Sequence, residues 1–348
     1  MVSKINNTFS AEKVEIIDFS KNKLRVIVSY YLLRVSRLQT ALQETPGDWG
    51  KYQKLFNNEV NHLFKQIISF EKKCIHRGDA ATLERVKSFF GRRFGKHFYY
   101  GDLSRWSIDK PFGYAGDFRV IDAIYENQPR TTGYCRLFDN YFQMSAIAVA
   151  VRNRKEDFKR KILNFVERNS EREVRIMNLA SGPCREIYEL YHEHPDLMAK
   201  VSFDCFDSEK KAHRYAMHLL GGVGKVNFII ENALKVALSK DVSKKVVSKY
   251  DFIYSMGLYD YLNFDLSVRL TRNLRDRLKE GGELHVADVR DRYYNPSVLY
   301  MEWAGDWNLL YRTDEEFFRI FMEAGFSPFK LSHSYEQQGV VQYIGAKK

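Results

Sequence analysis

The pattern of hydrophobic positions changes near the middle of the chain, and the two parts predict different structures. From about Ala11 to Phe94 apolar residues recur every three or four positions, as in the run Leu24–Leu33, which is typical of helices with one buried face. After Val174, short apolar or β-branched runs alternate with segments of helical period. This alternation favours a parallel sheet with helices on both faces, so we expect an α/β domain preceded by a helical one.

The end of the chain adds a distinctive feature to this sheet. After the helix expected around Asp314–Ala324, two strand-like runs are separated only by the short polar stretch Ser334–Gln338. They predict a terminal hairpin that places an antiparallel strand in an otherwise parallel sheet.

Two connecting segments complete the expected organisation. The stretch Phe98–Asp117 is rich in Gly, Asp and aromatic residues and contains Pro111, which predicts loop or short turns. A long helix is expected from about Arg136 to Asn169. We therefore divide the chain into a basic helical domain (1–110), a connecting lid and helix (111–170) and the α/β domain (171–348).

Charge and composition narrow the class of protein. The formal net charge is +11, and residues 1–100 carry 18 Lys and Arg against nine Asp and Glu. Such a surface could meet nucleic acid, an anionic lipid surface, or an acidic carrier protein or coenzyme, or it could be only a solvated helical face. No apolar run is long enough to span a bilayer and the first residues do not resemble a signal peptide, so we expect a cytoplasmic protein.

The cysteines and histidines predict neither a metal site nor disulfides. The four cysteines stand far apart, no C-x-x-C pair occurs, and the nine histidines lack ligand spacing.

The turn after the first predicted strand is the main candidate for a ligand site. It reads Ala180, Ser181, Gly182, Pro183, Cys184. A dinucleotide requires several glycines here, because backbone N–H groups must approach its pyrophosphate closely. This turn contains one glycine, and its proline has no N–H, so a nicotinamide or flavin dinucleotide is disfavoured. The turn suits S-adenosylmethionine, which has no phosphate, although a turn that serves only helix–strand packing remains the alternative.

The ends of the next two strands carry polar candidates. Asp207 and Ser208 follow the second strand, where a carboxylate can accept both hydrogen bonds of a ribose diol, although Asp207 could instead cap a helix. Asn232 and Ala233 follow the third strand, where an adenine would lie. A plain loop is the alternative there.

The fourth strand leads into Met256 and Gly257, which we expect to lie near the transferred methyl group. Beyond them, an L-K-E-G-G turn begins at Leu278. The order of these features over roughly residues 150–348 resembles class I S-adenosylmethionine-dependent methyltransferases, with a Rossmann-like sheet. Asn178, Ala180 and Cys184 depart from that pattern, in which an acidic residue and two glycines are frequent.

A narrower resemblance covers more of the chain. Its segments are similar to those of bacterial methyltransferases that include enzymes assigned to 3-hydroxypalmitic acid methyl ester, a quorum-sensing signal: Lys110–Asp117, Ala150–Arg154, Gly257–Tyr261, Asp306–Trp307 and Tyr311–Thr313. The resemblance implies methylation of the carboxyl group of a fatty acid or related acyl compound, free or bound to a carrier. It leaves open other small-molecule acceptors and a homodimeric state.

These segments also contain residues whose chemistry suits a sulfonium cofactor with an amino-acid tail. The rings of Tyr114 and Tyr259 could contact the sulfonium cation, or could be ordinary core edges. Asp117 could bind the cofactor's ammonium group or cap a helix. Arg152 or Arg154 could pair with the methionyl carboxylate, or with a nearby Glu.

Methyl transfer is an in-line displacement, so the protein chiefly aligns the reactants. A carboxylate acceptor needs only an orienting group, for which Arg312, Tyr259 and Tyr311 are the candidates. A hydroxyl acceptor needs a base, for which Asp260 and His333 are the candidates. The predicted catalytic residues are therefore Tyr259, Asp260 and Arg312.

Two other hypotheses compete with a small-molecule methyltransferase: a nucleic-acid methyltransferase and a binding module. The stretch Arg92–Tyr100 interleaves basic and aromatic residues, as in nucleic-acid-binding proteins, but no N-P-P-Y-type motif is present. The third hypothesis is a binding module that retains the fold without turnover. In the favoured hypothesis the N-terminal helices cover the cofactor, and Trp303 and Trp307 line an acyl pocket or are structural aromatics.

Overall fold

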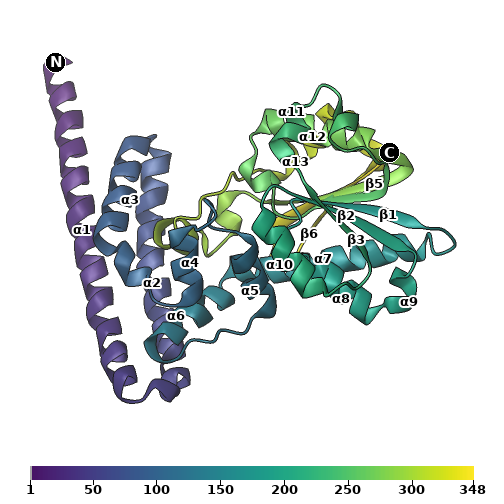
Figure 1. Ribbon diagram of the computed structural model, residues 1–348. Helices are drawn as coiled ribbons and strands as arrows, with labels where there is room; N and C mark the ends of the chain where they lie inside the picture. Colours follow the sequence, from purple (N-terminus) through teal and green to yellow (C-terminus); the bar gives the residue numbers. More distant parts are fainter. Residues whose placement is uncertain (1) are drawn as a thin grey trace. The chain divides into compact units, whose positions relative to one another are not determined.

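The computed structural model describes the backbone of residues 2–348 and the side chains from residue 22 onward. The chain forms two compact units, each visible in Figure 1. The helical unit contains the residues up to Ala115, Gln128–Met144 and Ser297–Trp307. The sheet unit contains Gly116–Asn127, Ser145–Pro296 and Asn308–Lys348.

The helical unit confirms the predicted N-terminal helices. Its elements are α1 (Val2–Glu44), η1 (Pro46–Asp48), α2 (Trp49–His76), α3 (Ala80–Phe94), η2 (Gly95–Phe98), α4 (Asp102–Asp109), α6 (Gly133–Met144) and the π-helical turn η6 (Tyr300–Ala304). Aromatic rings fill its core: Phe90 packs edge-on against Trp303, with ring centroids 5.5 Å apart. The indole of Trp303 also donates to a carboxylate oxygen of Glu71 at 3.0 Å, so the short segment after the fifth strand is built into this core.

The sheet unit contains the remaining elements. They are α5 (Phe118–Glu126), α7 (Ala146–Glu167), β1 (Val174–Leu179), α8 (Arg185–Glu193), α9 (Pro195–Met198), β2 (Val201–Asp207), α10 (Lys210–Leu220), β3 (Lys225–Ile230), α11 (Ala233–Leu238), η3 (Val242–Lys244), β4 (Tyr250–Ser255), η4 (Tyr259–Tyr261), α12 (Phe264–Asp276), β5 (Leu278–Val289), η5 (Arg292–Tyr294), α13 (Asp314–Glu323), η7 (Pro328–Lys330), β6 (Leu331–Tyr335) and β7 (Val341–Lys347).

The sheet has the parallel strands and the terminal hairpin expected from the sequence. Its seven strands run β3-β2-β1-β4-β5-β7-β6. The strands β1 to β5 are parallel, whereas β7 is antiparallel to both β5 and β6. This is a Rossmann-like sheet with a terminal antiparallel hairpin, the class I arrangement predicted above. The carboxyl ends of β1, β2 and β4 consequently lie side by side.

Helices cover both faces of the sheet. Figure 1 shows α11, α12 and α13 on one face and α7, α8, α9 and α10 on the other. On the first face, Ile253 of β4 belongs to a core cluster with Leu270 of α12 and Phe317 of α13. On the second, Phe158 of α7 lies against Tyr254 of β4, with ring centroids 5.8 Å apart. Side chains alternate between the two faces of the sheet along each strand. The cores on the two faces therefore hold the carboxyl ends of the same strands in place.

Two predictions about connecting segments were wrong. The helix expected over Arg136–Asn169 is broken, because the extended residue Ser145 caps α7 by accepting a hydrogen bond from the N–H of Ala148 at 3.3 Å. The segment Phe98–Asp117 is not loop throughout, since it contains α4, whose Leu103 is buried.

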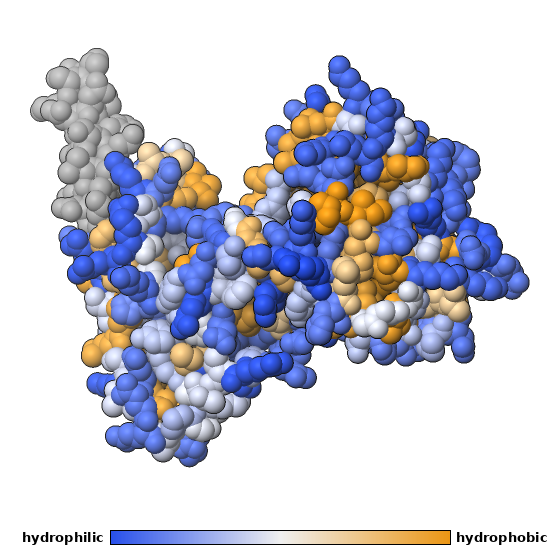
Figure 2. All heavy atoms as spheres, viewed as in Figure 1, coloured by the Kyte–Doolittle hydropathy of each residue, from blue (hydrophilic) through white to orange (hydrophobic). Residues whose placement is uncertain are grey.

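The visible surface of each unit mixes hydrophilic and apolar residues (Figure 2). Exposed apolar side chains include Val26, Tyr30 and Leu33 on α1 and Leu234 and Leu238 on α11. Within the described part of the chain, no helix has the length and apolar character needed to cross a membrane.

Candidate functional site

The turn between β1 and α8 has a strained backbone. Ala180, Gly182 and Cys184 all have positive φ, at 56°, 56° and 55°. Only glycine adopts this left-handed conformation at little cost, and such strain in other residues is concentrated at functional sites. Class I methyltransferases, which this turn resembles, frequently have glycine at the positions of Ala180 and Cys184. Because these two residues have positive φ, they carry backbone strain that glycine would relieve.

Asp207, at the end of β2, holds this turn in place. Its Oδ2 accepts a hydrogen bond from the N–H of Gly182 at 2.9 Å, and its Oδ1 accepts from the N–H of Glu209 at 2.9 Å. The cap of α10 is Glu209 rather than Asp207, so the helix-capping alternative does not describe this carboxylate. A carboxylate can accept about four hydrogen bonds, which leaves Asp207 capacity for a diol. Ser208 beside it is exposed.

Three of the four N–H groups of the turn, those of Ser181, Gly182 and Cys184, are bonded within the protein. The N–H of Ser181 donates to the carbonyl of Phe206 at 3.1 Å, Gly182 donates to Asp207, and that of Cys184 to the carbonyl of Ser181 at 3.4 Å. Pro183 has no N–H. The turn therefore offers no free row of donors for a pyrophosphate. It does present the Ser181 hydroxyl, which is buried without a hydrogen-bond partner.

The residues that follow β3 cap the start of helix α11. The Oδ1 of Asn232 accepts from the N–H of Leu234 at 2.7 Å and so caps α11, whose first residue is Ala233. The preceding Glu231 accepts from the N–H of Asn232 at 2.9 Å and pairs with Lys245 at 3.4 Å. This capping fixes the side chain of Asn232 and leaves its amide nitrogen available to a ligand.

The tip of β4 lies against the end of β1 and against a buried arginine. The hydroxyl of Ser255 donates to the carbonyl of Leu179 at 2.9 Å, and Met256 is buried. Gly257 is exposed, and a Cβ at this position would lie 3.4 Å from Nη1 of Arg154. The tip of β4, where the methionyl part of the cofactor is expected, therefore lies next to Arg154 of α7.

The structure brings the three predicted catalytic residues together. The Arg312 guanidinium donates to the carbonyl of Tyr259 at 2.9 Å and to Oδ2 of Asp288 at 2.8 Å, and it also contacts the carbonyl of Leu262. Asp260 accepts from the N–H of Val289 at 2.9 Å.

These contacts leave little freedom in the network. The hydroxyl of Tyr259 is hydrogen-bonded to Thr271 at 2.8 Å. Burial, together with the carboxylate of Asp260, raises the pKa of Asp288 well above its usual range. Arg312 and the two aspartates thus fix the tips of β4 and β5 relative to each other.

The remaining predicted residues lie in different surroundings. Asp117 is fully buried and caps α5, accepting from the N–H groups of Arg119 at 2.8 Å and Val120 at 3.2 Å. Arg152 is half-buried on α7, and its burial lowers its pKa. Tyr114 and Trp303 belong to the helical unit.

Sequence reasoning missed one buried carboxyl group in the site. Glu186, in the first turn of α8, is fully buried, and its Oε1 accepts from Tyr254 at 2.8 Å and from the Asn178 amide at 2.9 Å. Burial raises its pKa to about 7. The sequence did contain a signal for Glu186: it is an acidic residue at the expected start of a helix, where a carboxylate is favoured.

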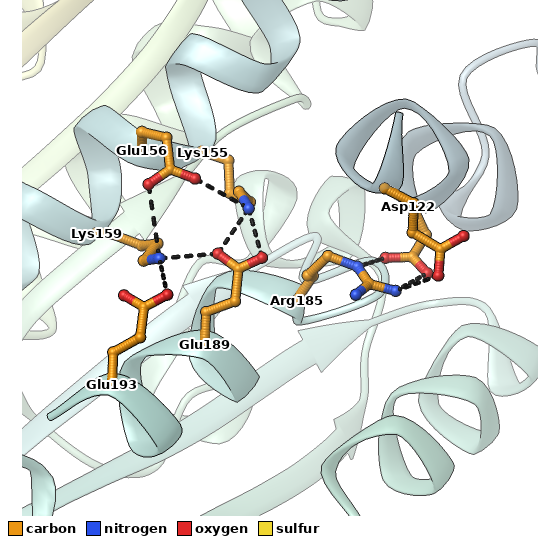
Figure 3. Close-up of polar contacts among 8 residues, drawn as sticks. Asp122, Lys155, Glu156, Lys159, Arg185, Glu189 and Glu193 are labelled. Carbon is orange, nitrogen blue, oxygen red and sulfur yellow. Dashed lines mark hydrogen bonds and ion pairs between the residues drawn. The ribbon is translucent and has the colours of Figure 1, made fainter. Parts of the chain in front are cut away.

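Ion pairs fasten the helices that border the site onto α8. On one side, Lys155 and Lys159 of α7 donate to Glu189 at 2.6 and 2.8 Å (Figure 3). On the other, the guanidinium of Arg185 forms a two-point contact with Asp122 of α5. Both networks are largely buried, so they hold α5 and α7 at fixed positions beside the β1 turn.

Comparisons with known proteins agree with this fold. No protein-family model matches the chain, and no curated protein sequence matches it significantly. A Bordetella parapertussis structure described as a possible exported protein has a TM-score of 0.54 and 19% identity, covering 67% of this chain and 79% of that chain. At this identity the similarity concerns the fold.

Two methyltransferase structures are more distant. An O-methyltransferase family protein of Burkholderia thailandensis has a TM-score of 0.43 and 15% identity, covering 76% of this chain and 70% of its own. The magnesium protoporphyrin IX methyltransferase of Synechocystis PCC 6803, solved with bound SAM, has a TM-score of 0.41 and 11% identity, covering 58% and 83%.

Proposed function

We propose that this chain is an S-adenosylmethionine-dependent methyltransferase acting on a small molecule. One observation carries the proposal: the strained β1 turn is locked by the carboxylate of Asp207, and three of its four N–H groups are already bonded within the protein. A phosphate-containing dinucleotide needs those donors free, whereas a nucleoside without phosphate does not.

The residues at the strand tips fit the parts of this cofactor. Asp207 retains acceptor capacity for the ribose diol, and Asn232 offers an amide nitrogen to the adenine. The buried hydroxyl of Ser181 has no hydrogen-bond partner within the protein, and a bound ligand would supply one. Met256 and Gly257 border the position of the methionyl part. Bound there, the cofactor supplies a methyl group activated by the adjacent sulfonium.

The chain's own contribution to the reaction is alignment of the acceptor. The acceptor oxygen forms a bond to the methyl carbon as the carbon–sulfur bond breaks, and the electron pair of that bond remains on sulfur. The rigid network of Arg312, Asp260 and Asp288 fixes the tips of β4 and β5, between which an acceptor would be oriented. Arg312 acts in this proposal as a positioning residue.

We propose a carboxylate as the acceptor group. The two candidate bases are occupied: Asp260 accepts a backbone hydrogen bond from Val289, and His333 on β6 is bonded to the Gln342 side chain at 3.1 Å. A carboxylate is ionised at neutral pH, loses no proton on methylation and yields a neutral ester. A fatty acid or related acyl compound, free or carrier-bound, satisfies this requirement.

The experiment is methyl transfer from isotopically labelled S-adenosylmethionine to a panel of carboxylic acids and matched alcohols. We expect acids of medium to long chain to be methylated, and Asp207→Ala to lose at least about tenfold in kcat/KM, because a charge-assisted hydrogen bond contributes about 1.5–3 kcal/mol. Asp196→Ala, on exposed helix α9, is the matched control and should be unaffected. Cofactor binding without transfer to any acid would contradict the carboxylate proposal, and an unimpaired Asp207→Ala enzyme would contradict the assigned site.

A further inference from the structure

Arg154 is a buried cation without a counter-ion. Its side chain is 5% exposed, it forms no ion pair with any residue that the structure describes, and its Nε has no hydrogen-bond partner. Its polar neighbour is the hydroxyl of Tyr125 on α5, and Asp260 acts on it only through longer-range electrostatics. A buried charge is costly unless it is paired, so this position is suited to an anionic ligand group.

Glu186 is the complementary case. It is 0% exposed, both of its hydrogen bonds, from Tyr254 and Asn178, end on Oε1, and Oε2 has no partner. No cation among the described residues pairs with it. A buried carboxyl oxygen without a donor is costly as well, and a ligand cation would satisfy it.

The neighbours of these two residues show that neither is needed to hold the helices together. Lys155, next to Arg154, and Arg185, next to Glu186, make the ion pairs that fasten α7 and α5 to α8 (Figure 3). The adjacent Arg154 and Glu186 are left out of these networks, although both are equally or more deeply buried.

Both groups border the same part of the site. The guanidinium of Arg154 lies next to Gly257 at the tip of β4, since a Cβ there would be 3.4 Å from its Nη1. Glu186 is bonded to Asn178 in β1 and Tyr254 in β4, which are paired in register. The phenol of Tyr125 interacts with the charges of both. Asp207, the ribose anchor, lies on β2, on the far side of β1 from β4.

We infer that Arg154 and Glu186 together form an α-amino-acid site, in which Arg154 binds the carboxylate and Glu186 the ammonium group of the cofactor's methionyl part. The inference rests on the proposed function and extends it to the recognition of the zwitterion. It also gives Asn178 a role, because its amide donates to Oε1 of Glu186 and holds that carboxyl group in place.

The test compares two stable ligands on the full-length protein. S-adenosylhomocysteine carries the amino-acid group, and 5′-methylthioadenosine lacks it but keeps the adenosine and sulfur. We expect Arg154→Met and Glu186→Gln each to weaken binding of S-adenosylhomocysteine by roughly 10- to 100-fold, as for a lost charge-assisted bond, and to leave the affinity for 5′-methylthioadenosine within about twofold. Arg160→Met, at an exposed position of the same helix, is the matched control and should affect neither ligand.

The outcomes separate this inference from the function on which it rests. If wild-type protein binds S-adenosylhomocysteine but Arg154→Met weakens both ligands equally, or neither, the amino-acid site is wrong and the proposed function stands. If wild-type protein binds neither ligand, both fail. Circular dichroism melting of each variant identifies any that does not fold, and the pH dependence of wild-type binding, argued in the Discussion, tests the role of Glu186 without a variant.

Discussion

At the scale of single residues, the sequence located the turn after β1 but did not reveal its backbone strain. Asp207 and Gly182 could be placed at the strand tips because strand ends and glycine turns have local signatures, and their roles toward a cofactor stay predictions. The left-handed conformations of Ala180 and Cys184 were not predicted, because they depend on bonds from β2 that are remote in sequence. Glu186 was missed although its place at the start of a helix was a local signal, because its burial and its two donors depend on β1 and β4.

The raised pKa of Glu186 predicts a pH dependence of cofactor binding. Burial favours the neutral acid and brings its pKa to about 7, whereas an ammonium ligand requires the carboxylate. Binding of S-adenosylhomocysteine should therefore weaken about tenfold as the pH falls from 8 to 6, relative to 5′-methylthioadenosine. Calorimetry of the two ligands at each pH provides this ratio.

Other groups that face Glu186 do not explain such a change. They are Tyr254 from β4, Tyr125 from α5, Lys155 from α7, and Cys184 and Glu189 beside it on the chain. Burial raises the pKa of Tyr125 to about 12 and that of Tyr254 well above its usual range, whereas hydrogen bonds from Lys155 and Lys159 outweigh burial and lower that of Glu189. A pH-independent ratio, or the same dependence in Glu186→Gln, would exclude the assigned role.

At the scale of elements, the hydrophobic pattern predicted the parallel strands and the terminal hairpin, since most of the strands are short apolar runs. Helix boundaries were less predictable. The break at Ser145 depends on one hydroxyl bonded to a backbone N–H, which the continuous apolar pattern around it does not reveal. Nor does local sequence show that α7 is fastened to α8 by charged side chains.

This fastening predicts the effect of Glu189→Gln. The substitution leaves Lys155 and Lys159 buried without the carboxylate they share. We therefore expect the free energy of unfolding to fall by about 2–4 kcal/mol at pH 7. This is somewhat less than the loss on breaking a fully buried ion pair, because Glu189 is 19% exposed. Chemical unfolding measures this loss. Glu167→Gln, at an exposed position of α7, should change stability by less than about 0.5 kcal/mol.

The pH dependence of that loss has a defined sign. Because the pKa of Glu189 is lowered in the folded protein, its contribution is fully present above the ordinary carboxyl value of about 4.5 and disappears as the pH falls through the folded value. The difference in stability between wild type and Glu189→Gln should therefore shrink below about pH 4.5. A difference that is unchanged in acid would show that the ion pairs are not its source.

At the scale of the whole molecule, the two kinds of structure were predictable but their boundaries in sequence were not. The helical unit is assembled from three separate segments, and its core includes Tyr300 and Trp303, which follow the fifth strand. The aromatic residues of that segment were considered as an acyl pocket or as structural aromatics; Trp303 has the structural placement, bonded to Glu71. The predicted role of the N-terminal helices as a cover for the cofactor stays a prediction.

We propose that the strand tips of the sheet unit bind S-adenosylmethionine rather than a dinucleotide, because three of the four N–H groups of the β1 turn are bonded within the protein. Calorimetric titration of the full-length chain with S-adenosylmethionine and, separately, with NAD tests this choice of ligand. We expect saturable binding of S-adenosylmethionine with a dissociation constant in the micromolar range and no binding of NAD. Binding of NAD, or no binding of S-adenosylmethionine, would show that the cofactor is wrongly assigned.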